Sequence, residues 1–157
     1  MKKPTKAIKD SLISAPALLT LLAAAISFGL ASSVRAAGDG QVCGPQTLRG
    51  SYVFTAHGFN IVSGVAQPKA IVEGIDFNGD GTLSVPFGTL SVNGFIIQIA
   101  PGGVGTYTLD ASCQGTLTFT SGPVNYNIFV LGGGKEISMI QTDANTVFEG
   151  TVKRVSR

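Results

Sequence analysis

Apolar and polar residues alternate in short segments along most of the chain after residue 50. Tyr52, Phe54 and Ala56 alternate with smaller or polar residues, which is the pattern of a strand with one buried face. The segments are rich in Val, Ile, Phe, Tyr and Thr, and Gly, Asn, Asp and Pro separate them. These features predict an all-β domain with strands at 51–59, 70–77, 82–90, 95–99, 106–109, 116–120, 125–131, 136–141 and 146–153.

Four connectors contain residues that accept positive φ and are therefore typical of hairpins. They cover residues 78–81, 93–94, 132–134 and 143–145. Successive hairpins of this kind produce an antiparallel meander of eight or nine strands. Because an open sheet of that size would expose two edges, we expect the meander to close into a small barrel.

The alternation predicts which residues fill the barrel. Tyr107, Leu109, Leu117 and Phe119 alternate with threonines, so one face should be buried and the other wet. Residues 125–141 depart from this pattern because apolar side chains occur on both faces. We expect the outer face there to be covered by the segment around Cys43, by a long loop or by another subunit.

The first 36 residues have the layout of a secretory signal. Four lysines precede an apolar stretch from Leu12 to Leu30, and small residues follow it up to Ala36. This pattern predicts a signal helix with cleavage after Ala36, or after Ala37 as a near alternative, leaving a β-barrel domain of residues 37–157. An uncleaved anchor is the competing interpretation, since residues 12–34 are long enough to span a bilayer.

Removal of the signal changes the charge of the protein. Residues 37–157 contain six basic and eight acidic side chains, a net charge of −2, although the whole chain has +2. A nucleic-acid partner or an anionic membrane surface therefore has no support from composition.

Both cysteines, Cys43 and Cys113, lie in the domain that would remain after cleavage. An even number of cysteines in an exported chain favours a disulfide. Two cysteines and one histidine cannot supply the four ligands of a structural zinc site. We therefore expect a Cys43–Cys113 bridge and a secreted or periplasmic location.

One segment has the spacing of a calcium loop. Asp76, Asn78 and Asp80 occupy its first, third and fifth positions. The acid expected at the twelfth position is absent, because Phe87 stands there, and the flanking segments are predicted strands rather than helices. A β-turn made of Asn, Gly and Asp is the favoured interpretation, and we expect no bound metal.

Two side chains are candidates for acid–base chemistry. Glu73 shares a predicted strand face with Ile71, Ile75 and Phe77, so it would point into the barrel, where burial would raise its pKa. The opposite register would turn Glu73 outward. His57 is the only histidine of the chain and the second candidate.

The motifs of several segments resemble those of small exported bacterial proteins. The motifs of this chain that carry the resemblance are Leu48-Arg-Gly-Ser-Tyr52, the turn at 76–81, Asn93-Gly94, Gly105-Thr-Tyr107, Cys113-Gln-Gly-Thr116, Glu136-Ile137 and Gln141-Thr-Asp143. That group is similar to the allene oxide cyclase-like and calycin-like barrels. The resemblance implies a barrel with a possible ligand cavity, and it implies no catalytic residue at a matching position.

Two classes of function follow from these residues. The first is a non-catalytic binding or structural module that holds a small apolar ligand or contacts a protein partner through 125–141. The second is a cofactor-free isomerase or cyclase in which Glu73, with or without His57, moves a proton. The chain contains neither a Gly-x-Ser-x-Gly motif nor a phosphate-binding glycine loop. We favour the binding module and expect no cofactor.

Overall fold

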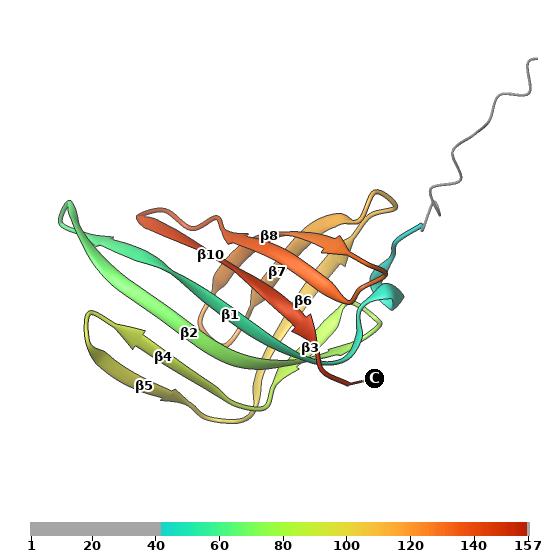
Figure 1. Cartoon of the computed structure of the whole chain (residues 1–157), viewed down its shortest axis with the longest axis horizontal. Coiled ribbons are helices and arrows are strands. Elements are labelled where there is room, and N and C mark those ends of the chain that lie inside the picture. The colour runs from blue at the N-terminus through green and yellow to red at the C-terminus, as the bar shows by residue number, and fades with distance from the viewer. Residues whose placement is uncertain (1–41, 157) are drawn as a thin grey trace, which may run out of the picture. The chain divides into compact units, whose positions relative to one another are not determined.

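The structure is a computed structural model that describes residues 42–156 (Figure 1). The predicted signal segment 1–36, its cleavage site and the alternative membrane anchor lie outside the described residues. Within 42–156 the chain forms one short 3-10 helix and ten strands. They are η1 (Pro45–Thr47), β1 (Arg49–Val62), β2 (Val65–Asn78), β3 (Thr82–Val85), β4 (Gly88–Val92), β5 (Phe95–Ile99), β6 (Gly103–Leu109), β7 (Gln114–Phe119), β8 (Val124–Leu131), β9 (Glu136–Gln141) and β10 (Thr146–Arg154).

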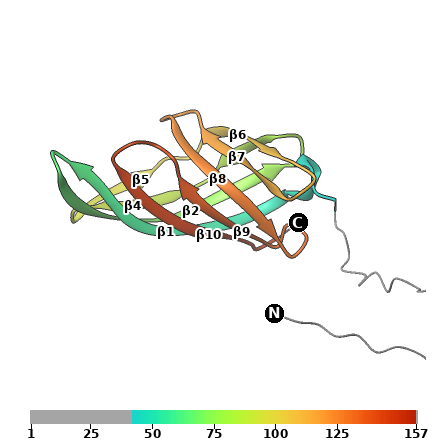
Figure 2. The same ribbon diagram turned by 90° about the horizontal axis from the view of Figure 1, so that it is seen from above.

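Eight of these strands form a closed antiparallel barrel, which confirms the predicted fold class. Their order around the barrel is β1-β10-β9-β8-β7-β6-β3-β2, and β2 pairs with β1 to close the ring. The remaining two strands, β4 and β5, form a hairpin that pairs with residues 69–73 of β2. Figures 1 and 2 show this hairpin at the end of the barrel away from the C-terminus.

The β4–β5 hairpin exists because the predicted strand 82–90 breaks at Pro86. Proline has no N–H to donate to a sheet ladder, so a continuous strand ends there. The residues before the break pair with Asp76 and Phe77 of β2, and those after it pair with residues 69–73 of the same strand. On the side away from β1, β2 therefore pairs first with β4 and then with β3. The barrel continues through β3, and the β4–β5 hairpin leaves the ring at this point.

The predicted alternation of buried and exposed residues is confirmed. Tyr52, Phe54 and Ala56 point inward from β1, and Tyr107 and Leu109 do so from β6. The interior is continuous from one end to the other and contains the aromatic and aliphatic side chains of Leu48, Tyr52, Phe54, Ile75, Phe77, Leu83, Tyr107, Leu117, Tyr126, Ile137, Met139, Phe148 and Val152. Edge-to-face contacts order the rings, among them Phe77 with Tyr52 and with Tyr107, at centroid distances of 5.0 and 5.1 Å.

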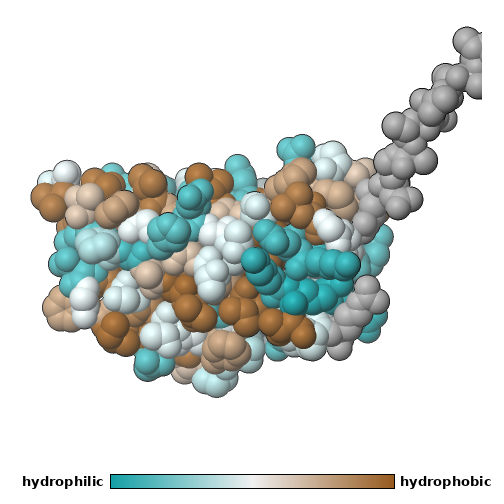
Figure 3. Space-filling view, viewed as in Figure 1, coloured by the Kyte–Doolittle hydropathy of each residue, from teal (hydrophilic) through white to brown (hydrophobic). Residues whose placement is uncertain are grey.

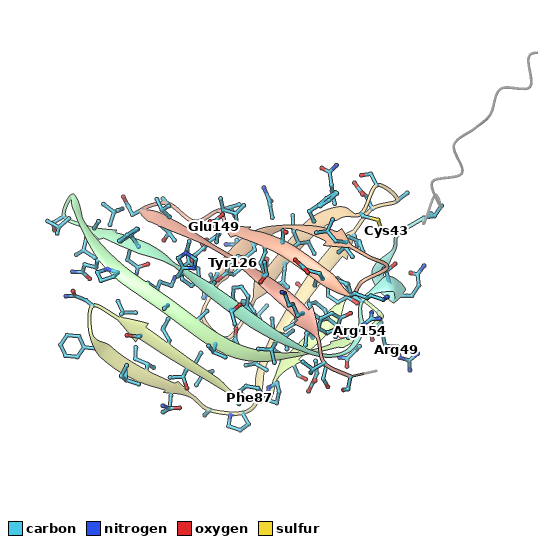
Figure 4. All side chains as sticks on the ribbon, viewed as in Figure 1. Cys43, Arg49, Phe87, Tyr126, Glu149 and Arg154 are labelled. Atoms are coloured by element: carbon cyan, nitrogen blue, oxygen red, sulfur yellow. A yellow bond between two sulfur atoms is a disulfide. The ribbon has the colours of Figure 1, made fainter. Side chains whose placement is uncertain are left out.

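The segment from Cys43 to Leu48 closes one end of the barrel, and we call it the plug. Leu48 is fully buried beneath the barrel end. The hydroxyl of Tyr107 donates to the carbonyl oxygens of Pro45 and Leu48 at 2.8 and 3.1 Å. Arg154 donates from Nη2 to the carbonyl of Thr47 at 3.0 Å. In Figure 4, Cys43 and Arg154 lie at this end of the molecule.

Gly134 lets the β8–β9 turn approach the plug closely. It adopts a φ of 79°, and a Cβ atom there would lie 2.4 Å from the carbonyl oxygen of Thr47. Its own carbonyl accepts a hydrogen bond of 2.7 Å from the hydroxyl of Tyr52. Only glycine satisfies both the backbone conformation and the close contact.

Tyr107→Phe should lower the free energy of unfolding by about 1 to 3 kcal/mol, because the buried bond to the Leu48 carbonyl and the part-buried bond to the Pro45 carbonyl are both lost. Chemical denaturation of the variant and the parent protein measures the difference. Thr106→Val, on the outer face of the same strand, is the matched control and should change stability by less than about 0.5 kcal/mol. Equal stability of the Tyr107 variant and the parent would show that water replaces the phenol.

The outer face of residues 125–141 remains open within the described part of the chain. Phe129, Leu131 and Ile140 are exposed there, while Tyr126, Ile128 and Met139 point inward. No segment of 42–156 covers these apolar side chains, contrary to the expectation that the Cys43 segment or a loop would do so. Figure 3 shows exposed apolar side chains as separate patches among polar ones on the face in view.

None of the helical structure in residues 42–156 is long and apolar enough to cross a bilayer.

Candidate functional site

The candidate site is built around Glu73 of β2. At this residue, β2 lies between β1 on one side and β4 on the other. Its cross-strand neighbours are Phe54 and Gly88. The strand alternation that buries Ile75 and Phe77 also turns Glu73 inward, so the inward register is the one adopted. Glu73 is only 5% exposed, and it is the one buried charged residue within 42–156.

Glu73 faces a partly open cavity of about 270 Å³ that begins in the barrel interior. Glu73, Val85, Tyr126 and Phe148 form its buried part, and the exposed residues Ser121 and Gly122 of the β7–β8 turn belong to its rim. The remaining wall is mostly apolar and is contributed by Lys69, Ile71, Leu90, Ile99, Gly103, Val104, Phe119 and Val124. Ile99 and Leu90 come from the β4–β5 hairpin, so the hairpin completes the cavity wall.

The Glu73 carboxyl group contacts the empty space of this cavity. No residue of 42–156 donates a hydrogen bond to it, and in the same part of the chain no fully buried side-chain oxygen or nitrogen lacks a partner. The carboxyl oxygens are therefore accessible from the cavity rather than enclosed by side chains. Burial raises the pKa of Glu73 to about 7, because an apolar environment disfavours the charged form.

Tyr126 provides a second polar group in the cavity. It points into the barrel from β8 (Figure 4). Burial raises the pKa of its phenol, and the negative charge of Glu73 raises it further. The phenol therefore stays protonated at neutral pH and can donate a hydrogen bond to a group held beside Glu73.

Lys69 is the basic residue of the cavity wall, and its ammonium group is already engaged. Its Nζ atom donates to Oε1 of Gln141 at 2.9 Å and lies 4.0 Å from the centre of the Phe148 ring. Burial lowers the pKa of Lys69, and the nearby charge of Asp143 opposes that change. Lys69 makes no contribution to the raised pKa of Glu73, whose cause is burial alone.

His57 lies on the opposite side of the barrel wall from Glu73. It points outward from β1 opposite Glu149 of β10, and both side chains are exposed. They line a wide outer groove of about 870 Å³, which also contains Phe129 and Ile140. Although this groove is larger than the interior cavity, it is an open hollow on the outside of the sheet. The structure therefore does not bring the two candidate acid–base residues together.

The calcium-like segment forms the tight turn between β2 and β3. Oδ1 of Asp80 accepts hydrogen bonds from the backbone N–H and the hydroxyl of Thr82, at 2.9 and 2.6 Å. Asp76 lies within β2, opposite Ser84 of β3. Within residues 42–156 no cluster of three or more His, Cys, Asp or Glu side chains could hold a metal ion. Asp76 and Asn78 thus belong to the end of β2, and Asp80 belongs to the turn that follows it.

The predicted disulfide between Cys43 and Cys113 is present. It joins the plug to the β6–β7 turn across a sequence separation of 70 residues, with a Cα–Cα distance of 5.0 Å. Asp110 orders this turn by accepting hydrogen bonds from the backbone N–H groups of Ser112 and Gln114. A disulfide is compatible with an oxidising extracellular or periplasmic environment.

Comparison with protein-family models, with curated proteins and with solved structures gives no match for this chain.

Proposed function

We propose that this protein is an exported binding module whose barrel holds one small apolar ligand. The observation that carries the proposal is the mostly apolar cavity of about 270 Å³, with Glu73 and Tyr126 as its inward polar groups. Small-molecule sites have this composition, in which apolar walls supply affinity and a few polar groups fix the orientation.

The size of the cavity limits the ligand. An apolar cavity of about 150 Å³ accepts benzene, so a cavity of 270 Å³ suits a ligand of about ten non-hydrogen atoms. The plug closes one end of the barrel, and the exposed rim at the β7–β8 turn offers an entry route. The proposed export agrees with the signal-like first 36 residues and with the disulfide.

Ethylbenzene should bind the folded protein in a 1:1 complex and raise its melting temperature. A ligand present at ten times its Kd stabilises the native state by about 1.4 kcal/mol, which corresponds to about 5 °C for a domain of this size. Differential scanning calorimetry at increasing ligand concentration measures the shift, and NMR titration gives the stoichiometry.

Two variants make this experiment specific to the cavity. Leu90→Trp adds volume at the cavity wall and should abolish binding while the circular dichroism spectrum is retained. Val147→Trp, at an exposed position outside the cavity, is the matched control and should bind like the parent protein. Absence of any melting shift in the parent protein would contradict the proposal and would direct attention to the outer groove at Phe129 and Ile140.

The raised pKa of Glu73 supports a second candidate, a cofactor-free isomerase or cyclase like the barrels that the sequence motifs resemble. A carboxyl group with a pKa of about 7 can both accept and donate a proton near neutral pH. Because His57 lies on the outer face, Glu73 would act alone or with the Tyr126 phenol. Exchange of the α-protons of cyclohexanone in D₂O, faster with the parent protein than with Glu73→Gln, would favour this candidate over simple binding.

A further inference from the structure

The cavity contains a carboxyl group that has no counter-ion among the described residues. Glu73 is 95% buried, its oxygens contact the cavity, and no residue of 42–156 hydrogen-bonds to it. A buried carboxylate is costly unless it is paired and hydrogen-bonded. A hydrophobic residue at this position would pack the barrel without that cost, so the carboxyl group needs an explanation in terms of what enters the cavity.

The charged and titratable groups near Glu73 do not fulfil the role of a counter-ion. Lys69 lies on the same strand, but its ammonium group is bonded to Gln141 and lies over Phe148. Tyr126 faces Glu73 from β8 and is neutral, and Asp143, close to Lys69, carries the same sign of charge as an ionised Glu73. The strands on either side of Glu73 present Phe54 and Gly88 to it.

The rings around the carboxyl group are also suited to a cation. Phe119, Tyr126 and Phe148 line the cavity, and Phe119 and Tyr126 meet edge to face with a centroid distance of 6.0 Å. Aromatic faces attract ammonium groups within about 6 Å. The Phe148 ring already has such a contact, because the ammonium group of Lys69 lies 4.0 Å from its centre.

We propose that the ligand of the cavity is a small apolar amine, whose ammonium group pairs with Glu73 while its hydrocarbon body fills the space beneath Leu90 and Ile99. This inference rests on the proposed binding function and names the chemical class of the ligand. An amine supplies both the positive charge and the N–H donors that the carboxylate lacks. An alcohol would supply a donor without the charge, and a carboxylate ligand would place a second negative charge beside Glu73.

Three probes with the same carbon skeleton test this choice: 2-phenylethylamine, 2-phenylethanol and phenylacetate. Each has about ten non-hydrogen atoms and therefore suits the cavity volume. Isothermal titration at pH 8 should give a Kd for the amine at least about tenfold lower than that for the alcohol, and phenylacetate should bind most weakly.

Glu73→Gln keeps the volume and removes the charge. The variant should bind the amine and the alcohol with Kd values within about threefold of each other. Glu149→Gln, which removes an exposed carboxylate on the outer face of β10, is the matched control and should keep the preference for the amine.

The pH dependence provides a second readout. Protonation of Glu73, whose pKa is about 7, removes the negative charge, so the amine should bind about tenfold more weakly at pH 6 than at pH 8. The amine stays protonated over this range. Glu73→Gln should abolish the dependence, whereas a contribution from Lys69, Tyr126 or Asp143 would persist in the variant.

The outcomes separate the inference from the proposed function. Equal affinity for the amine and the alcohol, or tighter binding of phenylacetate, would overturn the amine assignment and leave the cavity as a ligand site. Failure of all three probes and of ethylbenzene would overturn the binding function itself.

Discussion

Glu73→Gln should make the protein more stable than the parent above pH 7, by up to about 3 kcal/mol. The pKa of Glu73 is about 7 in the folded state and has an ordinary value of 4.5. The folded state therefore binds more protons than the unfolded chain between these values. As the pH rises from about 4.5 to 7, the parent loses about 1.4 kcal/mol of unfolding free energy per pKa unit, and the loss is complete above pH 7.

The measurement is the unfolding free energy of both proteins by urea denaturation from pH 4 to 8. Asp80, Asp110 and Asp143 have lowered pKa values, so they give the opposite trend, but they are common to both proteins and cancel in the difference. The difference between the curves should widen from pH 4.5 to 7 and then remain constant. Parallel curves would mean that the Glu73 carboxyl group is well hydrated in the folded state.

Replacement of both Cys43 and Cys113 by serine should lower the free energy of unfolding by about 2 to 4 kcal/mol. The bridge closes a loop with a sequence separation of 70 residues, and its removal gives the unfolded chain more conformational freedom. For a domain of this size, the melting temperature should fall by roughly 10 °C or more. Differential scanning calorimetry of the double variant, with the parent under oxidising and reducing conditions, tests this expectation.

The same double variant shows whether the two ends of the barrel are independent. The disulfide holds the plug. The cavity is lined instead by residues 69–73 of β2, by the β4–β5 hairpin and by the β7–β8 turn. Below its lowered melting temperature, the variant should bind 2-phenylethanol with the affinity of the parent protein. A large loss of binding would show that closure of the plug orders the cavity.

Alternation restricted Glu73 to two registers, inward or outward, and the structure adopts the inward one. In a strand the side-chain period is two residues, so Ile71, Ile75 and Phe77 determine its direction. The same rule, applied to Phe54 and Ala56, turns His57 outward, so its separation from Glu73 could also have been predicted. The disulfide was predicted from the number of cysteines together with the expected export.

The aromatic neighbours of Glu73 in the cavity could not be predicted. Tyr126 comes from β8 and Phe148 from β10, and their proximity to Glu73 depends on the pairing of strands far apart in the chain, whereas Lys69 lies on the same strand as Glu73. Tyr126 was recognised as a strand residue, but alternation gives no information on which inward residues share a layer. The break at Pro86 was missed because the apolar pattern continues through it, although proline in a strand interior was a signal for it.

The pairing of the first barrel strand with the last has a consequence for the folding of this chain. Nine residue pairs, from Tyr52 with Arg154 to Asn60 with Thr146, join β1 to β10. The ring cannot close until the final strand is available, and until then β1 and β9 each present an unpaired edge. Contacts of such sequence separation slow folding to milliseconds or longer. Loss of β10, Thr146–Arg154, would therefore leave a sheet with two open edges, which favours association between copies.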